Sequence, residues 1–166
     1  MGKKSFLIRP WKKGEENYVA DAHERIYVEE YGWNENFYKY AKQIACDFGA
    51  APRKPREELW IAEMDGAPAG CVMLVGTDDP NVAQLRLFLV EKAARKQGIG
   101  SALVQELLKK AREWGYKRII LWTAEPLHDA RRYYGKLGFT MTERNENHDW
   151  RGDGGAVAEE KWEMEL

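Results

Sequence analysis

A basic segment with two glycines, RKQGIGS at residues 95–101, stands at the start of an amphipathic helical pattern. The first N–H groups of a helix have no partner within the helix and carry the positive end of its dipole. Glycine allows a ligand to approach the backbone closely, and Arg95 and Lys96 add positive charge beside it. The pattern is typical of an anion-binding site, although a capped turn without a ligand would need the same glycines.

Two well-known phosphate-binding motifs do not fit this segment. A dinucleotide fingerprint needs a third glycine where the chain has Leu103, and the P-loop string G-x-x-x-x-G-K-[ST] is absent. A dinucleotide-dependent enzyme is therefore the weaker interpretation.

Alternating helical and strand patterns define the elements that position this segment. We expect the Asp65-Gly66 pair to form a hairpin turn, and a polar turn at 77–81 to complete an antiparallel meander. We expect strands at 5–9, 58–64, 69–75, 82–90, 118–123, 139–143 and 161–166, and helices at 15–31, 34–48, 99–114 and 129–137. This order predicts one α/β (α+β) domain spanning residues 1–166. Its sheet is mixed and mostly antiparallel, with about seven strands and about four helices.

Three finer expectations follow from the same patterns. The second helix should bury Phe37, Tyr40, Ala41, Ile44 and Ala45 on one side. The continuous apolar strand at 118–123 should be buried on both faces. The polar, glycine-rich stretch at 145–155 should form a mobile loop.

Composition and charge exclude several classes of protein. The 166 residues are 44% hydrophobic and 32% charged, with a net charge of -1, so charge gives no reason to expect nucleic acid or a membrane as the main partner. Two cysteines, Cys46 and Cys71, are too few for a disulfide framework and lack metal-ligand spacing. With no long apolar run and no signal-peptide pattern, we expect a cytoplasmic protein with reduced thiols.

Two motifs in a fixed order carry a family resemblance. The strand ending in Leu89-Val90 leads into R-x-x-G-x-G, and the helix near residue 130 carries A-x-x-x-Y-x-x-x-G-F. The matching residues are Leu89, Val90, Arg95, Gly98, Gly100, Ala130, Tyr134, Gly138 and Phe139. In this order, over roughly residues 6–166, the chain resembles the GNAT superfamily of N-acetyltransferases.

A narrower resemblance rests on HERIYVEEYGWNENF and on AQLRLFLV together with RIILWT. These strings are similar to the acetyltransferase half of bacterial proteins that fuse a MarR-type DNA-binding domain to a GNAT domain. We expect a stand-alone relative without the DNA-binding domain.

The superfamily resemblance implies acetyl-CoA as co-substrate, without a metal. It places the pyrophosphate on the amides of the loop residues Arg95, Lys96, Gln97, Gly98, Ile99, Gly100 and Ser101. It also implies that main-chain groups of Leu89 and Val90 hold the pantetheine arm like an added strand. Ala130 is assigned to the same cofactor site. The strand 82–90 should splay from 118–123 and leave a slot for the thioester.

The resemblance also implies direct transfer of acetyl to an amine. Main-chain N–H near Leu89 would polarise the acetyl carbonyl, and Tyr134 would protonate the departing thiolate as general acid. Two departures bear on this role. Leu127 stands where many relatives carry Asn, and Gly135 lies inside the helix, at a cost of about 1 kcal/mol relative to Ala. They leave open an alternative, a catalytically weak acyl-CoA sensor or regulatory module.

No motif identifies the acceptor site, a pocket for a primary amine of a small molecule, amino acid or peptide. The end of the first helix walls this site in the superfamily, which assigns Glu30, Tyr31 and Trp33 to it. The candidate bases are His23, Glu29, Glu30 and Glu63, of which His23 has the right ordinary pKa.

Arg86 lies within a strand and would bind a substrate carboxylate if it faces the cleft. Trp60, Trp122 and Trp150 would add an aromatic wall, although core packing explains the first two more simply. A homodimer through the C-terminal strands is a further expectation from the resemblance.

Overall fold

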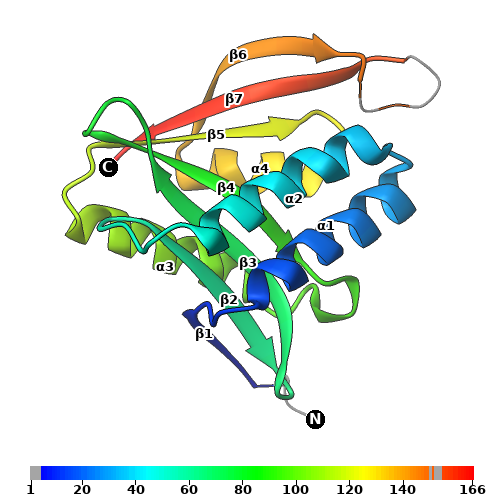
Figure 1. Cartoon of the computed structure of the whole chain (residues 1–166). Coiled ribbons are helices and arrows are strands. Elements are labelled where there is room, and N and C mark those ends of the chain that lie inside the picture. The colour runs from blue at the N-terminus through cyan, green and yellow to red at the C-terminus, as the bar shows by residue number, and fades with distance from the viewer. Residues whose placement is uncertain (1–4, 150, 152–154) are drawn as a thin grey trace.

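The computed structural model describes residues 5–149, 151 and 155–166. The expected order of elements is confirmed (Figure 1). The strands are β1 (Phe6–Pro10), β2 (Glu58–Met64), β3 (Ala67–Gly76), β4 (Val82–Val90), β5 (Arg118–Ala124), β6 (Thr140–Asn147) and β7 (Val157–Glu165). The α-helices are α1 (Glu15–Tyr31), α2 (Glu35–Ala50), α3 (Ile99–Glu113) and α4 (His128–Leu137), with a 3-10 turn at Lys92–Ala94.

The seven strands form one sheet in the order β1-β2-β3-β4-β5-β7-β6. Every neighbouring pair is antiparallel except β4 and β5, which run parallel. Asp65 and Gly66 make the β2–β3 hairpin turn, and both have the positive φ that such a turn requires. The sheet is therefore mixed and mostly antiparallel, as predicted.

Helices cover both faces of the sheet (Figure 1). One core joins α3 and Tyr134 of α4 to the face that bears Trp60, Val72 and Leu74. A second core joins α1 and α2 to the opposite face, which bears Leu59 and Ile61. The alternation along β2 thus sends successive side chains into different cores.

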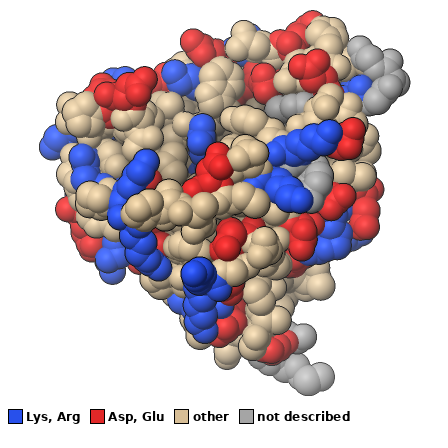
Figure 2. All heavy atoms as spheres, viewed as in Figure 1, with Lys and Arg blue, Asp and Glu red and all other residues tan. Residues whose placement is uncertain are grey.

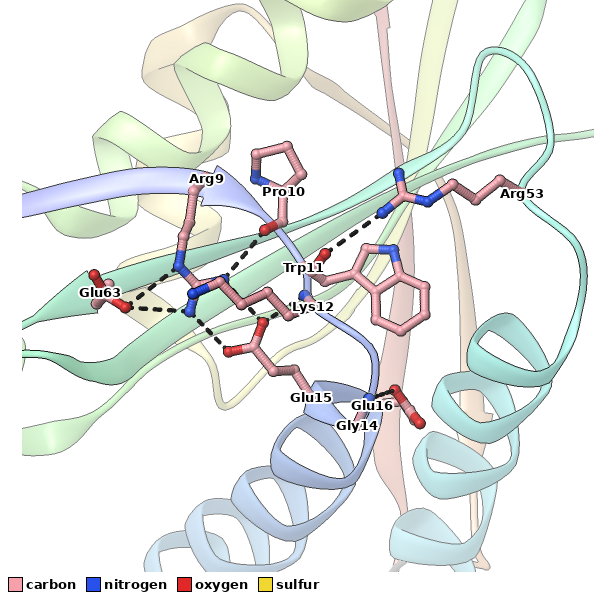
Figure 3. A network of polar contacts seen from close by, with 9 residues as sticks. All are labelled: Arg9, Pro10, Trp11, Lys12, Gly14, Glu15, Glu16, Arg53 and Glu63. Carbon is pink, nitrogen blue, oxygen red and sulfur yellow. Dashed lines mark hydrogen bonds and ion pairs between the residues drawn. The ribbon is translucent and has the colours of Figure 1, made fainter.

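The first strand and helix are fastened to the sheet by one polar network (Figure 3). The Arg9 guanidinium of β1 donates two hydrogen bonds of 2.8 Å to the Glu15 carboxylate of α1. The same guanidinium lies 3.3 Å from a carboxylate oxygen of Glu63 on β2. Glu63, one of the expected bases, is therefore a structural partner of Arg9.

The central parallel pair separates along its length. β4 and β5 are paired only from Val82 opposite Arg118 to Leu85 opposite Leu121. Beyond Leu85, residues 86–90 of β4 and 122–124 of β5 form no pairs with each other. The expected splay is confirmed, and it leaves the backbone edge of the second half of β4 free.

Two expectations about burial are wrong. Tyr40 of α2 is 56% exposed, although the helical spacing placed it on the buried side. β5 is not buried on both faces, because Arg118 and Trp122 are exposed while Ile119 and Leu121 are buried. Trp122 of this strand lines the cavity described below. The Phe37 side chain lies outside the described part of the chain.

The C-terminal hairpin is longer than the sequence indicated. β6 runs to Asn147 and β7 begins at Val157, so residues 145–147 at the start of the expected mobile loop belong to a paired strand. β6 forms the sheet edge and is exposed along almost its whole length. Such a strand buries no apolar face, so it shows no alternation of apolar and polar residues.

Candidate active site

The segment at 95–101 forms a tight turn into the start of α3. Lys96 and Gly98 have positive φ values of 64° and 86°, and Gly98 is the N-cap residue. Within the described residues, the amides of Ile99, Gly100 and Ser101 donate no hydrogen bond. A Cβ built on Gly98 would have no atom within 4 Å, so the space beside this residue is open. Unpaired amides at the start of a helix can hold an anion.

Arg95 is paired with a carboxylate at the end of α1. Its two terminal nitrogens lie 2.8 Å from the two oxygens of Glu30, and its Nε donates to the Val90 carbonyl at 3.1 Å. Its charge is therefore offset, and its role is to tie the turn to α1 and β4. The hydrogen bond from Arg95 holds the pKa of Glu30 below its usual range. Glu30 is thus a poor base, and it is not among the described residues that line the large cavity described below.

A bulge in β4 lies where the strand leaves β5. Cys71 of β3 is opposite Leu89 and Met73 is opposite Arg86, so the strand has an extra residue between them. Leu87, at this bulge, has a φ of 50°, which is strained for leucine. The Cys71 thiol donates to the Leu87 carbonyl at 3.1 Å and so supports the bulge from inside the core. Past it, Leu89 and Val90 pair with β3 on one side only.

A cavity of about 790 Å³ lies at this split. Its described lining comes from helices α1, α2 and α4 and from strands β4, β5, β6 and β7. Its described lining is His23, Tyr27, Trp33, Asn36, Tyr40, Ala41, Ile44, Gln84, Leu85, Arg86, Leu87, Phe88, Trp122, Thr123, Ala124, Leu127, Ala130, Tyr134, Asn147, Asp149 and Glu159. Five residues assigned from the sequence thus line one space: His23, Trp33, Arg86, Ala130 and Tyr134.

Tyr134 reaches the cavity from α4 and is only 4% exposed. Its ring packs near Phe88 and Phe139, at centroid distances of 6.4 and 5.6 Å. Its hydroxyl forms no hydrogen bond with another described residue. Burial raises the pKa of the Tyr134 phenol well above its usual range. The phenol therefore keeps its proton at neutral pH, which is the form that a general acid needs.

A buried ion pair fastens α4 in place. Glu160 of β7 is fully buried and accepts hydrogen bonds of 2.6 and 3.0 Å from Arg131 of α4. Trp162 Nε1 donates to the same carboxylate at 3.2 Å. Because Tyr134 follows Arg131 by three residues, about one turn, this pair fixes the height of Tyr134 above the sheet.

Leu127 stands at the N-cap of α4 and makes no side-chain capping bond. It lines the cavity next to Ala130. The polar contact that an Asn would supply at this position is therefore replaced by an apolar wall.

His23 lies inside the cavity wall and is 2% exposed. Its Nδ1 lies 2.7 Å from the Val19 carbonyl, so Nδ1 carries the proton and donates it. Burial lowers the pKa of His23 to about 4. The ring is therefore neutral at pH 7, and its remaining nitrogen is a weak base.

The other aromatic residues divide between cavity and core. Trp33 is buried, lines the cavity and stacks on Tyr27 at 5.4 Å, whereas Tyr31 is 37% exposed and not part of the described lining. Trp60 is a core residue that stacks on Trp114 at 6.2 Å. The core interpretation is wrong for Trp122, which is 42% exposed and lines the cavity. Trp150 lies outside the described residues.

One cavity residue was missed by the sequence analysis. Glu159 of β7 lies opposite Ala124 of β5 and lines the cavity. Burial raises its pKa, and the Asp149 charge adds to this, while a hydrogen bond from Asn147 acts against it. Its carboxylate is therefore a stronger base than an ordinary glutamate. No motif marks Glu159, and the expected strand began two residues after it.

Neither a metal cluster nor a membrane-spanning helix is found in the described part of the chain. No group of three or more His, Cys, Asp or Glu there could hold a metal ion. No described helix combines the length and the apolar character needed to cross a bilayer.

Solved N-acetyltransferase structures share this fold. An N-acetyltransferase structure from Staphylococcus aureus Mu50 superposes with a TM-score of 0.79 at 17% identity, covering 97% of this chain and 98% of that one. A Salmonella typhimurium structure that holds its cofactor acetyl-CoA gives a TM-score of 0.75 at 16% identity, covering 97% and 94%.

The model of the acetyltransferase (GNAT) family matches residues 19–139, and the chain belongs to this family. Human N-acetyltransferase 8B is 36% identical over 96 residues, which is 55% of this chain and 42% of that protein. The chain thus spans less than half the length of this curated relative.

Proposed function

We propose that the chain is an acetyl-CoA-dependent N-acetyltransferase that transfers acetyl directly to a primary amine. The observation that carries this proposal is the split between β4 and β5, with the open amides of α3 at one end and the buried Tyr134 phenol inside. Family membership supports acyl transfer. The related Salmonella structure with acetyl-CoA supports the choice of coenzyme.

The chain's own residues fit the coenzyme. The pyrophosphate lies on the amides at 98–101, with Lys96 and Gln97 at the edge of the turn. The free edge of β4 at Leu89 and Val90 bonds to the pantetheine arm, since β5 has moved away from it. Ala130 lies beside the arm, because it lines the same cavity.

The reaction uses two groups that the cavity brings together. Glu159 takes the proton from the acceptor ammonium, directly or through water, because its raised pKa makes it a suitable base. The neutral amine attacks the acetyl carbonyl, which main-chain N–H near Leu89 polarises. As the C–N bond forms and the C–S bond breaks, Tyr134 donates its proton to the leaving thiolate.

The acceptor is a primary amine of a small molecule, an amino acid or a peptide. One relative, N-acetylaspartate synthetase from Xenopus tropicalis, is 31% identical over 96 residues, which is 58% of this chain and 35% of that protein. Its name describes an acetylated amino acid.

We further propose that the enzyme is one domain of residues 1–166 that acts in the cytoplasm. Neither nucleic acid nor a membrane has a part in its action. The exposed edge strand β6 is a surface through which two copies can pair as a homodimer.

A second candidate, a weakly catalytic acyl-CoA sensor, is favoured by one observation. Leu127 caps α4 without a side-chain hydrogen bond, so the start of the helix that carries Tyr134 is less firmly held. Replacing Tyr134 distinguishes the two functions, since the acyl-CoA binding of a sensor does not depend on a general acid.

Calorimetric titration with acetyl-CoA, with NAD and ATP as controls, tests the coenzyme. We expect one-to-one binding of acetyl-CoA alone, weakened about tenfold or more in Gly98→Asp, which adds charge where the pyrophosphate lies. Gly115→Asp is the matched control, because Gly115 also has a positive φ and open space around it but lies at the other end of α3. Binding of NAD or ATP instead, or equal loss in both variants, would contradict the assignment.

A further inference from the structure

Arg86 is a charged group in the acceptor cavity that acetyl transfer itself does not use. It comes from the bulge of β4 and is half-buried. It lines the cavity described above and also an adjoining cavity of about 420 Å³, so it stands where the two meet. Within the described part of the chain, its guanidinium makes no ion pair and no hydrogen bond.

The other half-buried arginines of the described residues are all engaged. Arg9 is held by Glu15, and Arg131 by Glu160. Arg56 donates to the Pro80 carbonyl at 2.9 Å. Among these half-buried arginines of the described residues, Arg86 alone can receive a carboxylate without giving up a partner, and a guanidinium binds a carboxylate through two parallel hydrogen bonds.

Nearby carboxylates do not fill this role, because each has another partner. Asp47 accepts from Gln43 at 2.6 Å, Glu57 accepts from the Gly76 amide at 2.8 Å, and Glu58 pairs with Arg53 at 3.3 Å. All three line the adjoining cavity without an ion pair to Arg86. The guanidinium is left for a group that enters from outside.

The opposite charge lies farther along the same cavity. Leu85, next to Arg86, is opposite Leu121 of β5, and Glu159 is opposite Ala124. Three residues along a strand span about 10 Å, and both side chains reach into the space between. Because the Arg86 and Glu159 side chains both extend into this cavity, it can hold a small zwitterion with its ammonium toward Glu159 and its carboxylate toward Arg86.

Aromatic rings also line this cavity. Trp33 is buried there, while Trp122 and Tyr40 are 42% and 56% exposed and still line the cavity. Large exposed rings at a cavity are suited to covering an apolar side chain of a ligand.

We propose that Arg86 binds the carboxylate of the acceptor and that the acceptor is an α-amino acid with an apolar or aromatic side chain. This inference rests on the proposed acetyl transfer and adds its substrate class. Arg86 acts as a specificity-determining residue, because it holds the end of the substrate that does not react.

Initial rates of CoA release test this substrate class. Phenylalanine and leucine are each compared with the corresponding amide and with the amine that lacks the carboxylate. We expect the wild-type kcat/KM to favour the amino acids by about tenfold or more, since a charge-assisted pair is lost with the other two. In Arg86→Gln this preference disappears through a higher KM for the amino acids, with kcat little changed. Arg86→Lys retains part of it.

Arg112→Gln is the matched control, because Arg112 is exposed on α3 and does not line the cavity. Equal rates for amino acid, amide and amine in the wild type, or an unchanged KM in a folded Arg86→Gln, would overturn the inference and leave acetyl transfer standing. No turnover of any of these compounds by a protein that binds acetyl-CoA would also overturn the substrate class. Failure to bind acetyl-CoA would instead overturn the proposed function.

Discussion

Tyr134 is the residue on which the proposed chemistry depends most. Its phenol is protonated at neutral pH and lies in the cavity without a competing hydrogen bond among the described residues. In Tyr134→Phe we expect kcat to fall about 100-fold or more, because a general acid contributes at least that much. Acetyl-CoA affinity, measured by calorimetry, should change little.

Tyr116→Phe serves as the control for losing a tyrosine hydroxyl. The Tyr116 hydroxyl donates to the Arg56 carbonyl at 2.9 Å, away from the cavity. A full rate in Tyr134→Phe with a true substrate would show that another group protonates the thiolate.

At neutral pH the Glu159 carboxylate should lower the free energy of unfolding, although it serves as the base in catalysis. Because its pKa is raised in the folded protein, folding favours the protonated form. Its contribution to stability is therefore lost as pH rises from the ordinary glutamate value through the raised one. In Glu159→Gln we expect a higher melting temperature at neutral pH and a lower kcat. Glu143→Gln, an exposed change on β6, should alter neither; a lower melting temperature in Glu159→Gln would contradict this account.

His23 should make the protein sensitive to acid. Its pKa falls to about 4 in the folded protein, against 6.5 ordinarily, so only the unfolded chain gains a proton between these values. Stability is then lost as pH falls through this window, by about 3 kcal/mol for this group at the lower end. Denaturant unfolding at pH 7 and pH 4 should show a smaller loss in His23→Phe. An equal loss in both proteins would exclude His23 as the cause.

At the scale of elements, replacing two glycines by alanine should change the stability of the protein in opposite directions. Gly135 lies in the interior of α4, and a Cβ there would have no atom within 4 Å. We expect Gly135→Ala to stabilise the protein by about 1 kcal/mol. A Cβ on Gly70 of β3 would lie 2.8 Å from the Leu89 carbonyl oxygen, so Gly70→Ala should destabilise it and disturb β4. Thermal unfolding measures both, and destabilisation by Gly135→Ala would contradict the helix assignment.

The sequence predicted elements well where local chemistry specifies them. Asn34 caps α2 through its side chain, Gly138 ends α4 with a φ of 107°, and Asp65-Gly66 forms the hairpin. It found β6 but ended it at residue 143 instead of Asn147, because an exposed edge strand has no apolar face to mark its length. The narrower resemblance to fusion proteins stays a prediction, since no comparison bears on it.

At the scale of the whole molecule, the cavity depends on contacts between distant segments. Glu159 reaches it from the last strand and His23 from the first helix. Arg95 meets Glu30 across 65 positions of sequence. The periodicity of a helix or strand predicts which of its faces is buried. It does not predict which other element packs against that face, so these contacts could not be predicted from the sequence. Tyr134 and the turn at 95–101 were found because motifs mark them.

The surface of the molecule is consistent with its nearly neutral charge. On the face shown in Figure 2, Lys and Arg side chains are interspersed with Asp and Glu. No large field of one sign covers this face. The selectivity that we propose therefore comes from the few charges inside the cavity, above all Arg86 and Glu159.

Product analysis tests the central claim, direct transfer of acetyl from acetyl-CoA to a primary amine. The protein is incubated with acetyl-CoA and a panel of amino acids, small amines and a peptide, and products are quantified by mass spectrometry. The account predicts equal amounts of free CoA and one N-acetylated amine, with no acetyl group left on the protein. Release of CoA without an acetylated amine, or transfer through a stable acetyl-protein, would contradict it.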